Sequence, residues 1–122
     1  MSTDEALDDR PLPQRVVLLS LTHCVETDDG PAHTGEVIRT ARDHLDLLGD
    51  HALGKLGEAE VSRALNLLEA DGLVTQESRD TSPTGKGRPV YRPTVDRGTV
   101  TAAFESDDRV AAMLETYRTD WD

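Results

Sequence analysis

The chain has 122 residues, of which 13 are basic and 24 acidic, and its formal net charge is -11. Such acidity normally argues against binding to nucleic acid, because the duplex would repel the chain. The length predicts one domain with a modest core, and a chain of this size often gains stability by dimerising. Lys55 and Lys86 are the sole lysines, and scarce lysine beside abundant Asp is typical of proteins adapted to high salt.

Charge is distributed unevenly along the chain. Residues 1–54 carry four basic and eleven acidic side chains, whereas residues 55–97 carry seven of each. Residues 79–97 hold five basic and two acidic groups, which makes this short stretch the one basic segment. A local basic field in an acidic protein is what a confined phosphate contact requires. The alternative is a chance cluster on a solvated loop.

Several classes of protein are disfavoured by the residues themselves. Cys24 is the single cysteine, so no internal disulfide can form. No apolar run approaches the ~20 residues that span a bilayer, and the N-terminus lacks a signal-peptide pattern, so we expect a cytoplasmic protein without a membrane partner. No catalytic motif and no zinc-site spacing is present, so we expect no enzymatic activity, no metal and no cofactor apart from bound potassium or other salt ions. An apolar-helix cysteine is usually a core residue, and thiol sensing by Cys24 is the minor alternative.

The first part of the chain predicts a loose arm and two helices. Residues 1–11 are polar and acidic and form the arm. Residues 12–27 predict a helix with Pro13 in its first turn, apolar on nearly all sides, which therefore needs cover on more than one face. A turn follows over 27–33, and Thr34 is expected to cap a second helix whose buried stripe is Val37, Ile38, Ala41, Leu45 and Leu48.

Residues 57–71 predict a third helix, entered through a glycine-rich turn over 50–57. Val61, Leu65 and Leu68 recur at helical spacing and point inward, and Gly72 stands where a left-handed C-cap residue is needed. The outward residue types suit base edges: Arg pairs with guanine, Asn with adenine, and a small apolar group meets the thymine methyl. A plain amphipathic helix with a solvated outer face is the alternative.

Residues 73–94 predict a hairpin, because strand-like Leu73-Val74 and Val90-Tyr91 flank a loop rich in Ser, Thr, Pro and Gly. Residues 97–105 predict a short helical connector. Ser106 is expected to cap a last helix over 106–121. This helix carries one apolar stripe, which we expect to pack against the first helix across a two-fold axis. The residues expected in that dimer interface are Val17, Leu21, Val110, Met113, Leu114, Tyr117 and Trp121.

The segment 56–98 resembles the winged helix-turn-helix regulators of the PadR and MarR type. The resemblance rests on Leu-Leu-Glu-Ala-Asp-Gly-Leu-Val at 67–74 and on Gly-Arg-Pro-Val-Tyr-Arg-Pro-Thr at 87–94. Pro93 departs from the family, which usually has an apolar residue there. The acidic composition and the length are similar to those of haloarchaeal regulators of oxidative stress.

The resemblance implies a mainly α fold with a small β-hairpin wing, in the α+β class. Its expected parts are a flexible arm over 1–11, a winged helix-turn-helix domain over 12–98 and a dimerisation helix over 99–122. The implied function is sequence-specific transcription regulation by a homodimer on double-stranded DNA, with the third helix in the major groove and the wing on the backbone or minor groove. The expected DNA-contacting residues are Thr34, Lys55, Glu58, Ala59, Ser62, Arg63, Asn66, Thr84, Lys86, Arg88 and Arg92. The alternative is a winged-helix module that binds protein instead of DNA.

Overall fold

The structure, a computed structural model, describes residues 7, 10–28, 30–44, 57–78 and 89–121. Within them lie five helices and three strands. In chain order they are α2 (Leu12–Asp28), β1 (Ala32–His33), α3 (Thr34–Asp43), α4 (Glu58–Ala70), β2 (Val74–Ser78), β3 (Pro89–Pro93), α5 (Arg97–Phe104) and α6 (Ala111–Trp121). The order from α2 to β3 and the mixture of helices with a small antiparallel sheet make a winged-helix-like α+β fold.

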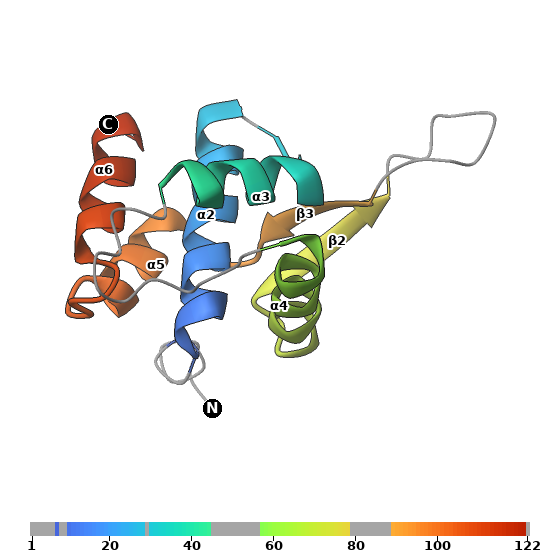
Figure 1. Ribbon diagram of the computed structural model, residues 1–122, viewed down its shortest axis with the longest axis horizontal. Helices are drawn as coiled ribbons and strands as arrows, with labels where there is room; N and C mark the ends of the chain where they lie inside the picture. Colours follow the sequence, from blue (N-terminus) through green and yellow to red (C-terminus); the bar gives the residue numbers. More distant parts are fainter. Residues whose placement is uncertain (1–6, 8–9, 29, 45–56, 79–88, 122) are drawn as a thin grey trace.

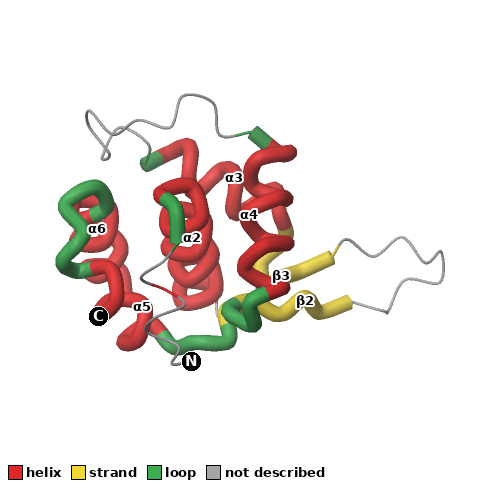
Figure 2. The backbone as a smooth tube through the Cα atoms, turned by 90° about the horizontal axis from the view of Figure 1, so that it is seen from below, coloured by secondary structure: helices red, strands yellow, loops and turns green. Residues whose placement is uncertain are grey.

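Helix α2 is the centre of the molecule. Every residue from Val16 to Thr22 is buried, which confirms that this helix needs cover on more than one face. Figures 1 and 2 show α3, α4 and the sheet on one side of α2, and α5 and α6 on the other. Two of its buried hydroxyls are satisfied locally or across the core, since Thr22 donates to the Leu18 carbonyl at 2.8 Å and Ser20 lies 3.3 Å from the Tyr117 hydroxyl.

A two-residue strand and a histidine cap begin α3, in place of the predicted turn and threonine cap. Ala32 and His33 pair with Tyr91 and Val90, which adds β1 to the hairpin and gives the sheet order β1-β3-β2. This pairing holds His33 in an extended conformation, and its Nδ1 accepts the Glu36 backbone N–H at 3.2 Å. Thr34 is therefore the first residue of α3 and not its cap. Leu45 and Leu48 of the predicted stripe lie outside the described residues.

Helix α4 has the predicted inner face and the predicted end. Val61, Leu65 and Leu68 are buried. Gly72 has φ +80°, and the Leu73 N–H donates to the Leu68 carbonyl at 2.9 Å. This hydrogen bond is that of a Schellman motif, the helix C-terminus that a left-handed glycine allows. The chain then enters β2 directly, so this turn fixes the angle between α4 and the hairpin.

Replacing Gly72 by Ala should lower the free energy of unfolding by about 1 kcal/mol, because an L side chain disfavours positive φ. No heavy atom lies within 4 Å of the position of the added Cβ, so the cost is that of the backbone alone. Gly30→Ala is the matched control, since its Cβ also meets nothing and its φ is not positive. Urea unfolding of both variants measures the difference, and equal midpoints would contradict the assignment.

The hairpin pairs Val74 with Pro93 through to Ser78 with Pro89 in an antiparallel register. Pro93 ends the strand without loss, because the next residue continues the contact: the Thr94 N–H donates to the Leu73 carbonyl at 2.9 Å and its hydroxyl to the Gly72 carbonyl at 2.6 Å.

An aspartate lies shortly before each of the two C-terminal helices. Asp96 caps α5 by accepting the Thr99 N–H at 2.8 Å. The predicted start of the last helix at Ser106 is wrong: Asp107 accepts the Arg109 N–H at 3.0 Å in a turn, and α6 begins at Ala111. The turn forms there because Asp107 is held by Arg15 of α2 at 2.8 Å. Burial by itself would raise the pKa of Asp107, but hydrogen bonds from Arg109 and the charges of both arginines lower it.

Candidate nucleic-acid interface

The outer side of α4 is the candidate interface. Figures 1 and 2 show no described helix or strand covering it. The predicted contact residues of this helix lie on that side, with Ser62 partly exposed and the others exposed: Glu58, Ala59, Ser62, Arg63 and Asn66. The 3.6-residue period that buries Val61, Leu65 and Leu68 turns these side chains outward together. The face therefore presents one guanidinium, one amide, one hydroxyl and one carboxylate, with the methyl group of Ala59.

The two glutamates at the start of α4 have different surroundings. Glu58 is exposed and borders a groove beside Ser62. The Glu60 carboxylate folds back over the helix start, where an added Cβ on Gly57 would lie 3.2 Å from its Oε2. Gly57 is the N-cap and has no side chain to satisfy the first N–H groups, so a carboxylate at this end of the helix dipole is favourable. The Glu60 carboxylate thus stabilises the start of α4, whereas the Glu58 carboxylate is exposed to a ligand at the candidate interface.

A groove of about 520 Å³ joins the starts of α3 and α4 to the sheet. Its lining includes Thr34 and Tyr91. Burial raises the pKa of Tyr91, and the Glu69 charge raises it further, so its hydroxyl stays protonated. The predicted contact residue Thr34 therefore borders the interface.

The predicted basic wing is described in part. Arg92 of β3 is exposed, and it pairs across the hairpin with Glu77 of β2 at 3.3 Å, which offsets its charge. Lys55, Thr84, Lys86 and Arg88 lie outside the described residues. Of the predicted contact set, the structure brings Thr34, Glu58 and Ser62 together around one groove, and Ala59, Arg63 and Asn66 share the exposed side of α4. Arg92 lies on β3 next to Tyr91, and successive residues of a strand point to opposite faces.

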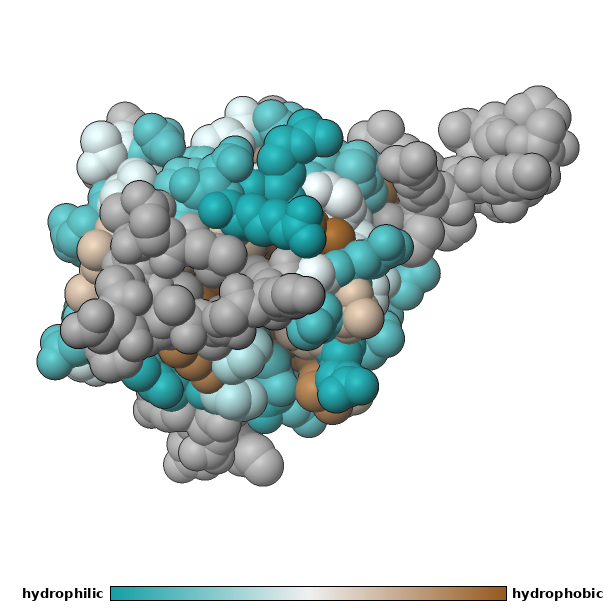
Figure 3. Space-filling model, in the orientation of Figure 1, coloured by the Kyte–Doolittle hydropathy of each residue, from teal (hydrophilic) through white to brown (hydrophobic). Residues whose placement is uncertain are grey.

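Leu67 was missed by the sequence analysis. It lies one helical turn after Arg63. Among the described residues it is the one large apolar residue that is exposed, with an exposed fraction of 45%. It borders an apolar groove of about 320 Å³ that α4 forms with the start of α2 at Pro11 and Pro13. The helical period could have placed Leu67 beside Arg63, because residues four apart share a face. Figure 3 shows that hydrophobic residues form small separate patches on this view of a mainly hydrophilic surface.

The predicted dimer interface is buried within a single chain. Its members are 0 to 9% exposed: Val17, Leu21, Val110, Met113, Leu114, Tyr117 and Trp121. The predicted packing of the last helix on the first is present, but α6 contacts α2 of the same subunit. The sequence predicted a dimer because these stripes were expected to lack cover inside one subunit, and their burial within the subunit contradicts that expectation.

Cys24 is a core residue in this structure. It is 4% exposed and lies 3.2 Å from the Thr40 hydroxyl. Burial raises the pKa of its thiol, and the Thr40 hydrogen bond offsets this in part, so the reactive thiolate is disfavoured. Among the residues that the structure describes, no group of three or more His, Cys, Asp or Glu side chains is arranged to hold a metal ion, and no helix is long and apolar enough to cross a membrane.

The whole arrangement is similar to part of a known DNA complex. Two chains of solved structures match, and one is the ORC1 protein of Aeropyrum pernix in complex with DNA. The TM-score is 0.72 and the sequence identity is 27%. The match covers 91% of this chain and 28% of that one, so this chain spans little more than a quarter of the ORC1 protein's length. No family model matches the chain, and no curated protein matches it.

Proposed function

We propose that this chain binds double-stranded DNA, with α4 in the major groove and the β2–β3 hairpin against the backbone or the minor groove. The observation that carries the proposal is the likeness, over 91% of the chain, to a protein solved in complex with DNA. The exposed polar face of α4 beside the hairpin supports it, because a helix of this kind reads base edges and a wing contacts the backbone.

Transcription regulation is the activity that we propose for this binding. Its support is the residue pattern around Gly72 and Tyr91, which resembles PadR and MarR regulators. The homodimer, the high-salt adaptation and the part in the oxidative-stress response stay predictions from the sequence. Light scattering in concentrated potassium chloride tests the dimer, and a monomer at micromolar concentration would contradict it.

Arg63 is the residue we propose for base readout. Arg63→Ala should cost about 1–3 kcal/mol of binding free energy and relax preference at one base pair, since a bidentate arginine discriminates guanine. The measurement is a fluorescence titration of duplexes selected from a random pool. Arg118→Ala is the matched control, because Arg118 is also an exposed arginine but lies on α6, away from α4. Equal affinity and equal base preference of the two variants would exclude α4 as the reader.

The second candidate function is a protein-binding module, and Leu67 favours it. An exposed leucine beside an apolar groove is a feature of protein interfaces more than of DNA-reading faces. Leu67→Glu separates the two candidates. If the chain binds a protein through this groove, the variant should lose that partner in a pull-down. If the chain binds DNA through α4 instead, the pull-down should capture no such partner from the wild type, and the variant should weaken binding of the selected duplex, because Leu67 shares a face and a groove with Arg63.

A further inference from the structure

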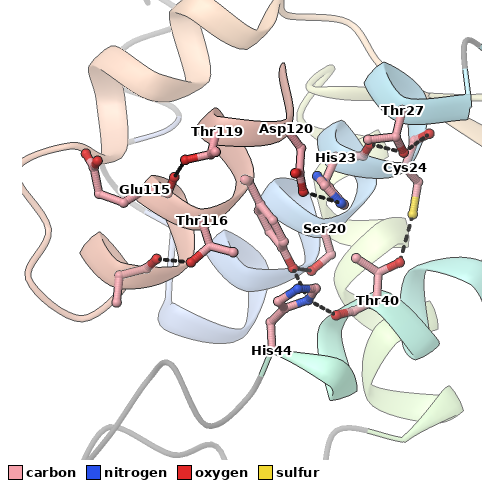
Figure 4. A network of polar contacts seen from close by, with 12 residues as sticks. Ser20, His23, Cys24, Thr27, Thr40, His44, Glu115, Thr116, Thr119 and Asp120 are labelled. Atoms are coloured by element: carbon pink, nitrogen blue, oxygen red, sulfur yellow. Dashed lines mark hydrogen bonds and ion pairs between the residues drawn. The ribbon is translucent and has the colours of Figure 1, made fainter. Parts of the chain in front are cut away.

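Three aromatic rings from three segments meet where α6 packs on the body of the molecule. Figure 4 shows Ser20 and His23 of α2 close to His44 at the end of α3, and the third ring is that of Tyr117 in α6. The imidazole of His23 stacks on the ring of Tyr117, with centroids 4.3 Å apart and an interplanar angle of 17°. His44 meets the same tyrosine edge-on at 4.9 Å. Tyr117 is fully buried, so this cluster is part of the contact between α6 and α2.

The hydrogen bonds at His44 show that Nδ1 is the ring nitrogen that carries a proton. Its Nδ1 lies 2.8 Å from the Thr40 carbonyl oxygen, which can only accept, so Nδ1 carries a proton. The Tyr117 hydroxyl lies 3.3 Å from the same nitrogen and 3.3 Å from the Ser20 hydroxyl. The tyrosine is therefore tied to α2 and to the end of α3 at once.

His23 fits this site in its neutral form. Its side chain is 13% exposed, and its Nε2 lies 3.7 Å from a carboxylate oxygen of Asp120, so the single proton of a neutral ring belongs on Nε2. Nδ1 is buried and has no hydrogen-bond partner among the described residues. A second proton would have to sit on Nδ1, where no described group accepts it, and would place a positive charge in the contact between the helices.

The charges around His23 act in both directions. Asp120 of α6 and Asp28 of α2 favour the imidazolium, whereas the His44 ring at 6.1 Å disfavours it. The Asp120 carboxylate is 54% exposed, so water screens its charge. Tyr117 presents the π face of its ring to His23. Its hydroxyl stays protonated and uncharged, because burial raises the pKa of Tyr117. Burial is the largest influence on His23, and the pKa of His23 is lowered.

We propose that His23, stacked on Tyr117, is an acid-sensitive latch that holds α6 against α2. With His23 neutral, the stack and the tyrosine hydrogen bonds keep the helix in place. Protonation of His23 puts an unaccepted N–H and a charge into the stack, and the ring gains water only when α6 moves away. Release of α6 would uncover the apolar stripe of Met113, Leu114 and Tyr117. The latch does not depend on DNA binding.

Protonation of His23 and opening of α6 are thermodynamically linked, so the pKa of His23 decides how pH changes the stability of the contact. Because the pKa of His23 is lower in the folded contact than the ordinary value of 6.5, the latch contributes stability above that value. This contribution is lost as the pH falls through the folded pKa. Opening takes up one proton in that window, so the opening constant of α6 should rise by up to about tenfold per pH unit.

Hydrogen exchange of the full chain, read by mass spectrometry and corrected for the intrinsic rate, tests the latch. Between about pH 7.5 and pH 5, amides of α6 should lose protection steeply, and amides of α4 should lose less. His23→Gln should remove the steep dependence from α6. His33→Asn is the matched control: it removes another histidine but keeps a side chain that can cap α3, so α6 should keep the wild-type dependence.

Three results would overturn the latch. The first is a flat pH profile of α6 protection in the wild-type chain, and the second is an unchanged slope in His23→Gln. The third applies even where that variant does not fold: an NMR titration of the His23 ring in the unaltered chain should have its midpoint below about 6.5, and a midpoint at or above this value contradicts the proposal. Asp120→Asn should move the midpoint lower still, since it removes the nearest charge that favours the imidazolium.

Discussion

The affinity for a selected duplex should change by less than about tenfold between about 0.5 and 3 M potassium chloride, if α4 reads DNA as proposed. A basic repressor with about six phosphate contacts would lose about 10⁴-fold over this range, from a log-log slope near -0.9 per contact. This chain has a net charge of -11, which repels the duplex at low salt, and concentrated salt screens that repulsion. Cations taken up beside acidic groups at the interface would offset the cations that the duplex releases.

Glu58 is the acidic group at which we expect this cation uptake. It is exposed and borders the groove between α3 and α4, so its carboxylate would face phosphates directly. Glu58→Gln should therefore steepen the fall of affinity with salt. Glu60→Gln is the matched control, since the Glu60 carboxylate is turned back on Gly57 and its loss should affect α4 stability more than the salt slope. A steep loss of wild-type affinity over this range would refute the prediction.

Tyr117→Ala should lower the free energy of unfolding by about 3–5 kcal/mol, the cost of emptying a large aromatic site in a core. Tyr117 is fully buried and joins α6 to α2 and α3 through two rings and two hydroxyl contacts. Tyr117→Phe keeps the ring and loses the hydroxyl, so it should cost about 1 kcal/mol. Urea unfolding in concentrated potassium chloride measures both.

The same pair of variants tests whether α6 covers its own subunit. If the helix packs within one chain, the loss in Tyr117→Ala is independent of protein concentration. If α6 packed on a partner subunit, as the sequence predicted, the substitution would weaken that association, and the loss relative to the wild type would vary with protein concentration. A loss in Tyr117→Ala that varied with concentration would therefore contradict the packing seen in Figure 2.

Local patterns determined most of the helices and the outward face of α4. The period of Val61, Leu65 and Leu68 defined the inner side of α4, and hence the outward position of Arg63 and Asn66. Gly72 marked the end of the helix because a positive φ is a property of the residue and needs no distant partner. The start of α2 beside Pro13 was predictable for the same reason, since proline fits a first helical turn wherever the helix packs.

Long-range contacts decided the rest. Strand β1 has two residues, too few for any period, and exists because β3 offers it a pairing edge. Because of that pairing, His33 is the cap of α3, and the predicted cap Thr34 is not. The stripe on α6 showed that one face is buried but not what buries it, because periodicity is a property of one helix and packing is a property of two. Arg15 and Asp107 are 92 residues apart in the chain and form an ion pair. This contact fixes the turn before α6, so the helix begins at Ala111 and not at Ser106, and it helps to hold α6 on α2 of the same subunit.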